Sequence, residues 1–344
     1  MFIEWQNNQP ALMRCSDKWQ ETEDTVSIKL QAADGCHLHF SSFKPGQFVS
    51  LGFELNDKLE YRAYSIASMP GDDHLKLTVK RVDGGLVSNH IVDQFSIGDT
   101  VQVLAPTGPF NCVDNQPKEK VVLLSAGCGI TPVMSMAKTW LRDKEQLDIV
   151  FIHMAKSAAK TIYFDELESI NAVHSNFDLK LLLKDNTGTQ HPQGRLDQQW
   201  LKTLCPDIGQ RTVYLCGPTR FMQDMEQYSL ALGVEADQFH QESFTPIESK
   251  QDSSSGGVVQ FEVPAFGVSA QVEQGSTLAD VLEQQGVPII IACRSGMCGS
   301  CKCKVNKGQV TRTSTETLSE EDIANGYTLA CSSQIETDVE VELM

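Results

Sequence analysis

The fold of the C-terminal part of this chain is indicated by one stretch, Ala292-Cys293-Arg294-Ser295-Gly296-Met297-Cys298-Gly299-Ser300-Cys301. A further cysteine follows at position 331. The spacing C-x4-C-x2-C with a distant fourth cysteine is one that holds a 2Fe–2S cluster. Four thiolates must reach two irons, so three come from one tight loop and one from a separate segment. Small residues between the cysteines let backbone amides turn toward the cluster sulfurs. The sequence therefore predicts a 2Fe–2S cluster held by four ligands, Cys293, Cys298, Cys301 and Cys331.

Zinc or disulfide bonds are the alternative uses of these cysteines. Zinc sites usually combine two short C-x2-C-like pairs, which this spacing lacks. Cys303 lies two residues after Cys301, outside the ligand spacing. If a strand begins there, alternation directs both side chains to the same side, so we interpret Cys303 as structural.

Composition limits the class of protein. The 344 residues suffice for two or three domains, and no apolar run reaches membrane-spanning length. The first residues lack a basic segment followed by an apolar one, so we expect no signal peptide. Eleven cysteines, an odd number, then indicate reduced thiols in the cytoplasm. The net charge of −17 argues against nucleic acid or an anionic membrane as partner; it favours a basic protein partner or merely solubility.

Residues 1–112 are expected to form the first domain. Short apolar strands alternate there with turns such as Pro45-Gly46 and Pro70-Gly71. Strands at this spacing are typical of a small antiparallel barrel. The clearest of them are Thr25–Leu30, Gln47–Leu51 and Leu75–Lys80.

Two motifs in this region suit a phosphate-bearing ring ligand. Arg62-Ala63-Tyr64-Ser65 ends one predicted strand, where the arginine offers a fork for phosphate, the tyrosine a flat face and the serine a hydroxyl for a ring nitrogen. Gly84-Gly85-Leu86-Val87-Ser88 opens a short helix that runs to about residue 94. The two glycines free backbone amides at a helix N-terminus, which is an anion site.

Residues 113–248 change to alternating strands and helices. The run Val121–Ala126 is continuously apolar, as expected for a buried parallel strand, and the segments 149–153, 180–183 and 212–215 are similar. This alternation predicts a parallel sheet covered by helices on both faces.

A glycine turn follows the first of these strands, in Gly127-Cys128-Gly129-Ile130-Thr131-Pro132. A turn of this kind between strand and helix can hold a dinucleotide pyrophosphate. The common dinucleotide fingerprint is incomplete, because Pro132 occupies the place of its third glycine and no acidic residue ends the second strand.

Together, these motifs resemble the ferredoxin–NADP reductase superfamily over nearly the whole chain. The resemblance implies that Arg62 and the glycine-led helix hold the flavin phosphates, and that Tyr64 and Ser65 line the isoalloxazine. It implies that Cys216-Gly217-Pro218 lies beside the nicotinamide; a buried core thiol is the alternative for Cys216. Phe244 either shields the flavin or is an ordinary strand aromatic. The implied site comprises Cys216 as the catalytic residue and, for cofactors, Arg62, Tyr64, Ser65, Gly84, Gly85, Ser88, Gly127, Gly129, Thr131, Gly217 and Phe244.

Residues 249–257 are polar and rich in serine and glycine, which predicts a flexible linker. A hairpin (258–263 with 268–272), a helix around residues 278–282 and a strand ending at Cys331 should follow. Residues 258–344 thus look like a β-grasp ferredoxin domain, and the chain is predicted to be multidomain, with an antiparallel flavin barrel, a parallel α/β nicotinamide domain and this ferredoxin domain.

The resemblance also implies an activity. NADH would give a hydride to FAD, and single electrons would leave through the 2Fe–2S cluster to a redox protein acceptor, with no membrane span involved. That acceptor would be the hybrid-cluster protein, or else a component of an oxygenase, epoxidase or desaturase system; a non-catalytic redox sensor is the remaining alternative. NADPH stays possible because Lys156 and Lys160 follow the second strand, although lysines in a loop are usually only solvated.

Overall fold

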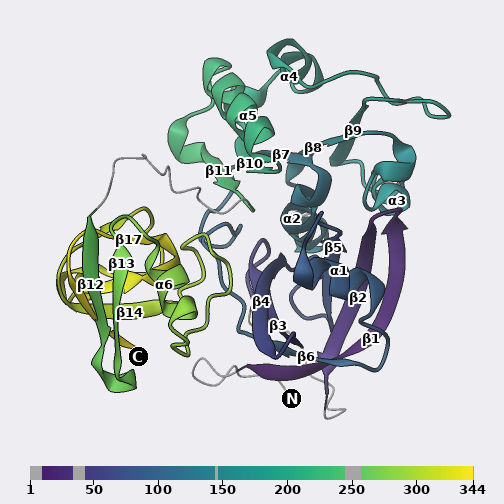
Figure 1. The fold of residues 1–344 in the computed structure, drawn as a ribbon. Helices are drawn as coiled ribbons and strands as arrows, with labels where there is room; N and C mark the ends of the chain where they lie inside the picture. Colours follow the sequence, from purple (N-terminus) through teal and green to yellow (C-terminus); the bar gives the residue numbers. More distant parts are fainter. Residues whose placement is uncertain (1–9, 34–42, 144–145, 245–256, 344) are drawn as a thin grey trace. The chain divides into compact units, whose positions relative to one another are not determined.

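The computed structural model describes residues 10–33, 43–143, 146–244 and 257–343. The chain divides into two compact units, residues 1–244 and 245–344 (Figure 1). Most of the predicted linker lies outside the described residues. Among the described residues, no helix is long and apolar enough to cross a membrane.

The first unit begins with an antiparallel sheet of six strands in the order β4-β3-β6-β1-β2-β5. A bridge between Ile66 and Leu77 joins its two edge strands, and Ala67 N donates to Lys76 O at 2.8 Å just beyond it, so the sheet closes into the predicted barrel. Its interior is apolar because alternate residues point inward. The elements are β1 (Ala11–Thr22), β2 (Thr25–Ala32), β3 (Phe48–Leu55), β4 (Lys58–Ser65), β5 (Leu75–Lys80), α1 (Leu86–Asp93) and β6 (Thr100–Val103).

A parallel sheet of five strands, in the order β11-β10-β7-β8-β9, forms the rest of the first unit, which we call the α/β part. The strand bounds are β7 (Lys120–Ala126), β8 (Asp148–Ala155), β9 (Phe177–Leu183), β10 (Thr212–Cys216) and β11 (Phe239–Glu242). The helices are α2 (Ile130–Asp143), α3 (Phe164–Val173), α4 (Gln198–Leu204) and α5 (Thr219–Ala231).

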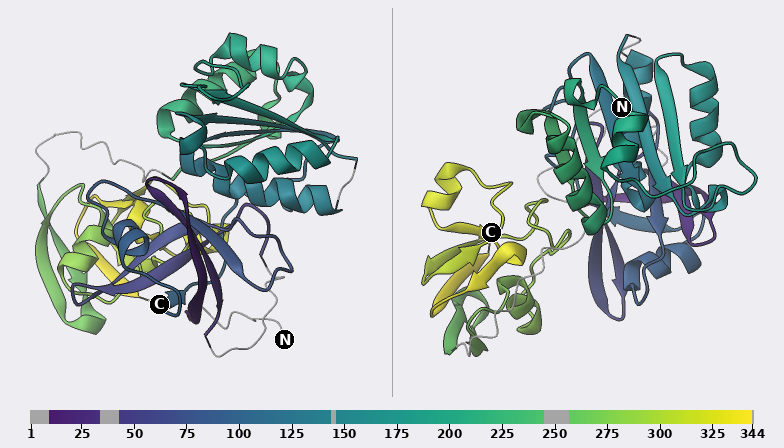
Figure 2. Two further views of the ribbon diagram at one scale, coloured as in Figure 1. Left: turned by 90° about the vertical axis from the view of Figure 1, so that its right-hand side faces the viewer. Right: turned by 90° about the horizontal axis from the view of Figure 1, so that it is seen from above.

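Helices cover both faces of this sheet, as the continuous apolar strands predict (Figure 2). Val121 and Leu123 of β7 pack with α2 and α3 on one face. Val122 and Leu124 pack with α4 and α5 on the other. Because successive side chains alternate, Ser125 and the last residue of β10, Cys216, continue the face that α2 covers.

The second unit has a five-stranded sheet in the order β13-β12-β18-β14-β16 and a separate pair, β15-β17. The first strand, β12, lies parallel to the last, β18, while the other pairs are antiparallel. The elements are β12 (Val258–Val263), β13 (Val268–Glu273), α6 (Leu278–Gln284), β14 (Lys302–Lys307), β15 (Val310–Arg312), α7 (Glu320–Ala324), β16 (Tyr327–Leu329), β17 (Ser333–Ile335) and β18 (Val339–Leu343).

One predicted boundary in this unit differs. The strand expected to end at Cys331 ends at Leu329, and the cysteine lies in the 3-10 turn Ala330–Ser332. The amide of Cys331 donates to the sulfur of Cys301 at 3.4 Å. The 3-10 turn therefore directs the amide of Cys331 toward the sulfur of Cys301. In a continued strand this amide would instead bond a neighbouring strand.

Candidate functional site

The loop between α6 and β14 brings the four predicted cluster cysteines together. The sulfurs of Cys301 and Cys331 are 3.3 Å apart, and the thiol of Cys293 lies beside those of Cys298 and Cys331. Among the described residues, no group of three or more His, Cys, Asp or Glu side chains is arranged to hold a single metal ion. The thiols instead touch in a row, a pattern that suits ligands shared between two irons.

The backbone of this loop also fits a thiolate-bound cluster. The amides of Ser295 and Met297 both donate to the sulfur of Cys293 at 3.4 Å, so the loop turns its donors toward the thiols. Gly296 has φ +71°, and an added Cβ would lie 2.6 Å from the Cβ of Ser314. Only glycine allows both this backbone conformation and this close approach.

Cys303 does not take part in this cluster of thiols. It lies in β14, is fully buried and packs in the apolar core of the second unit. Burial raises the pKa of its thiol to about 12. A neutral thiol in an apolar core agrees with the structural role predicted for it.

In the barrel, the predicted flavin-contacting residues end strand β4. The side chain of Tyr64 is partly buried against the barrel core, and desolvation raises the pKa of its hydroxyl above the ordinary range. Ser65 is 5% exposed, and its Oγ has no hydrogen-bond partner among the described residues. Because buried hydroxyls are normally paired, this orphaned oxygen fits a residue that bonds a polar ring atom of a ligand. Arg62 lies at the surface, where its Nη1 donates to the Tyr61 carbonyl at 2.6 Å and to Glu60 at 3.1 Å.

The turn before α1 is tightly built. Gly84 has φ +67°, and a Cβ added to Gly85 would lie 2.5 Å from Ser88 Oγ. That hydroxyl accepts from the amide of Val82 at 3.3 Å, so Ser88 holds the turn in place. The sequence analysis missed Asn89 in this helix, whose buried Oδ1 has no partner among the described residues.

The glycine turn after β7 lies directly against the end of β10. A Cβ on Gly129 would lie 2.0 Å from Cys216 O and 2.6 Å from Gly217 N. Gly127 adopts φ +56°, and Thr131 Oγ1 donates to Cys128 O at 2.9 Å within the first turn of α2. The sequence could predict the turn, but not its contact with a strand about 85 residues further along.

Electrostatic contacts place the flavin-side and nicotinamide-side residues near one another. The pKa of Cys216 is raised, chiefly by complete burial and further by the charges of Glu242 and Cys128. The pKa of Tyr64 is likewise raised mainly by burial, with Arg62 opposing the change and Cys128 adding to it. Cys128 in the glycine turn is therefore close to both Tyr64 of the barrel and Cys216 of the sheet. The glycine turn contacts strand β5 of the barrel and Cys216 at the carboxyl edge of the sheet.

Three protein-family models match the chain in succession. They describe an oxidoreductase FAD-binding domain (residues 14–112), an oxidoreductase NAD-binding domain (residues 123–227) and a 2Fe-2S iron-sulfur cluster binding domain (residues 262–336). NADH oxidoreductase HCR of Escherichia coli (strain K12) is 35% identical over 97% of this chain and 98% of its own length. The chain belongs to the ferredoxin–NADP reductase family of flavoproteins, in the branch with a C-terminal 2Fe–2S domain.

Other members of this reductase branch are similar over comparable lengths. The glycine betaine monooxygenase reductase subunit of Pseudomonas aeruginosa (strain UCBPP-PA14) is 34% identical over 98% of this chain and 96% of its own. The solved structure of phthalate dioxygenase reductase matches 97% of this chain and 98% of its own, with a TM-score of 0.66 and 21% identity, so it supports the fold. The predicted fold class and the cofactors FAD, NAD and a 2Fe–2S cluster are thus confirmed.

The comparisons leave the individual site residues of this reductase as predictions. Phe244 is the last described residue of the first unit and is 47% exposed, so its proposed contact with the flavin also stays a prediction. Glu242 was missed as a candidate, although it is 3% exposed and pairs in register with Cys216 across β10 and β11. Its position beside Cys216 follows from strand pairing.

Proposed function

We propose that this chain oxidises NADH and delivers the electrons singly to a redox protein, and that the hybrid-cluster protein is this acceptor. The observation that supports it most is that the glycine turn contacts both Cys216 and strand β5 of the barrel, in a chain that also brings four cysteines together. The first grouping suits hydride transfer between two rings, and the second suits one-electron exit.

Each group of residues has a separate task in this proposal. The bound flavin supplies the chemistry that converts a two-electron hydride into single electrons. Ser65 Oγ would bond a polar atom of the flavin ring, Tyr64 would pack on the ring, and Arg62, now bonded to Glu60, would hold a flavin phosphate. The Gly127–Gly129 turn would hold the pyrophosphate of the nucleotide. Cys216, neutral at every physiological pH because its pKa is raised, packs beside the nicotinamide without adding charge.

NADH is the proposed donor because, of the two lysines after the second strand, only Lys156 is exposed without an ion pair among the described residues. Lys160, which follows β8, is paired with Glu23 of the barrel. The similarity to NADH oxidoreductase HCR supports the same donor. We expect kcat/KM for NADH to exceed that for NADPH, and a higher value for NADPH would reverse this assignment.

The acceptor is the part of the proposal that most needs an experiment. The hybrid-cluster protein is the acceptor that the sequence resemblance implies, and similarity to NADH oxidoreductase HCR over nearly both whole chains supports it. The test is anaerobic reduction of purified hybrid-cluster protein by NADH and catalytic amounts of this chain, with ferricyanide as the control acceptor. Fast ferricyanide reduction without transfer to the hybrid-cluster protein would exclude that acceptor.

An oxygenase component is the second candidate, because the similarity to glycine betaine monooxygenase reductase subunits is nearly as high. A glycine betaine oxygenase component therefore belongs in the same assay. The acceptor with the higher kcat/KM is the better candidate for the physiological one. Placement in the cytoplasm is proposed together with either acceptor.

A further inference from the structure

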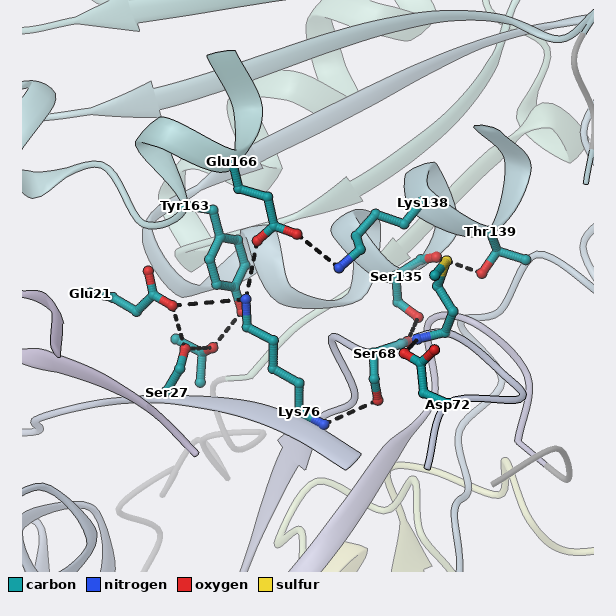
Figure 3. A network of polar contacts seen from close by, with 12 residues as sticks. Glu21, Ser27, Ser68, Asp72, Lys76, Ser135, Lys138, Thr139, Tyr163 and Glu166 are labelled. Atoms are coloured by element: carbon teal, nitrogen blue, oxygen red, sulfur yellow. Dashed lines mark hydrogen bonds and ion pairs between the residues drawn. The ribbon is translucent and has the colours of Figure 1, made fainter. Parts of the chain in front are cut away.

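A partly buried ionic network joins the barrel to the α/β part (Figure 3). At its centre is Lys76 of β5, whose side chain is only 10% exposed. Its Nζ lies 3.1 Å from Glu166 Oε2 on α3 and 3.8 Å from Glu21 Oε1 on β1. Lys138 of α2 reaches the other oxygen of Glu166 at 2.8 Å. Two cations and two carboxylates therefore connect two barrel strands to two helices of the α/β part.

The network also fixes the start of α3. The Nζ of Lys76 lies 4.0 Å from the ring centroid of Tyr163, which precedes that helix. Tyr163 has φ +62°, a left-handed conformation that costs a non-glycine residue energy. Its hydroxyl hydrogen-bonds to Thr78 of β5, two residues after Lys76. The barrel strand thus holds the tyrosine by both its ring face and its hydroxyl.

The backbone of Lys76 leads to the candidate flavin residues. Its carbonyl accepts from Ala67 N at 2.8 Å, and its amide donates to Ser68 Oγ at 3.1 Å. Ser135 of α2 donates to the carbonyl of Ser68 at 2.7 Å. The segment that follows Ser65 is therefore bound to β5 on one side and to α2, the helix after the glycine turn, on the other.

We propose that Lys76 is a positioning residue for hydride transfer, an inference that rests on the function proposed above. Through Glu166 and Tyr163, it holds the α/β part, with Cys216, in register with the barrel strand that carries Ser65. Hydride transfer needs the reacting atoms roughly 3–3.5 Å apart, and a displacement of about 1 Å can cost about 100-fold in rate. The Lys76 ammonium contacts Glu21 on β1, Glu166 on α3 and the ring of Tyr163 just before α3, so these directional contacts link the barrel to that helix.

The test uses Lys76→Met in the holoenzyme, since methionine keeps the apolar stem beside Tyr163 but removes the charge. Flavin reduction is followed by stopped-flow absorbance with NADH and with NADH deuterated at the transferred position. We expect the limiting rate to fall about 10- to 100-fold. We also expect a larger deuterium isotope effect on kcat/KM, with NADH affinity changed less than about threefold. Hydrogen–deuterium exchange on the flavin-free protein should rise in β5 and α3.

Arg211→Met is the matched control. Arg211 is 5% exposed and bonds Asp148 and Asp207, so the variant also removes a buried cation from the α/β part. It lies at the amino end of β10, away from the barrel-facing edge. We expect a lower Tm with an unchanged hydride-transfer rate and isotope effect.

The outcomes separate this inference from the proposed function. If NADH does not reduce the flavin bound to the wild-type protein, the proposed function itself is overturned. Folded Lys76→Met at the wild-type rate, or an equal rate loss in Arg211→Met, would overturn the positioning role of Lys76. If Lys76→Met does not fold, Lys138→Met decides instead: a loss of about threefold or more with a raised isotope effect supports the role, and wild-type behaviour overturns it.

Discussion

Gly129→Ala tests whether the glycine turn and the end of β10 form one site. The added Cβ would lie 2.0 Å from Cys216 O and 2.3 Å from Cys216 C, both backbone atoms that cannot rotate away. Contacts shorter than 3.0 Å are essentially never observed for Cβ atoms, so the turn and the strand must separate by about 1 Å. Such overpacking costs about 1–3 kcal/mol of stability. A displacement of about 1 Å costs about 100-fold in kcat/KM for NADH, equivalent to about 2.7 kcal/mol.

The assay is anaerobic NADH-dependent ferricyanide reduction, together with urea unfolding of the same samples. Gly233→Ala is the control: unlike Gly129, Gly233 has a positive φ (+94°), but an added Cβ there meets no atom within 4 Å, so the variant introduces backbone strain without a steric clash. The control should lose about 1–2 kcal/mol of stability without a change in NADH kinetics. Wild-type kcat/KM in a folded Gly129→Ala variant would refute the idea that this contact shapes the nucleotide site.

Three further perturbations test other parts of the site. Cys331→Ser should abolish the visible absorption of the cluster and leave flavin bound, whereas Cys303→Ser should keep the cluster spectrum; the reverse would reassign the fourth ligand. Arg62→Ala should weaken flavin binding about 10- to 100-fold by removing a charge-assisted phosphate contact of about 1.5–3 kcal/mol, and unchanged affinity on titration would remove Arg62 from the site. Burial lowers the pKa of His153 in the folded protein to about 3, from 6.5 in the unfolded chain. At a pH between these two values only the unfolded chain binds the proton, so acid favours unfolding. From pH 7.5 to 5.5 urea unfolding should show a loss of about 1.4 kcal/mol, which His153→Gln removes; an equal loss in both proteins would assign it to other groups.

The sequence predicted those helices, strands and turns that depend on residues close together in the chain. The continuous apolar run of β7 and the glycine turn after it predicted a buried parallel strand leading into a helix, as observed. The cysteine spacing likewise predicted four converging thiols, because loop ligands at short separations have few ways to meet two irons.

What the sequence could not supply depends on contacts between distant segments. Glu242 lies beside Cys216 because β10 and β11 pair in that register. In the sequence, Lys76 is one of several alternating residues of a strand, with no sign of its partners. Its partly buried partners come from β1 and α3, about 55 and 90 residues away in the chain. The strand expected to reach Cys331 ended early because a turn that brings its amide to a sulfur has no distinct local signal.

The order of strands in the second unit bears on when its cluster can be inserted. β18 is the last strand in the chain, yet it lies in the middle of the sheet, between β12 and β14. During synthesis, the loop with Cys293 leaves the ribosome well before residues 339–343 do. Until those residues emerge, β12 and β14 have no common neighbour, and the thiols stand in an unfolded segment. We therefore expect the cluster to be inserted after residues 339–343 have paired, while the first unit can fold and take up its flavin earlier.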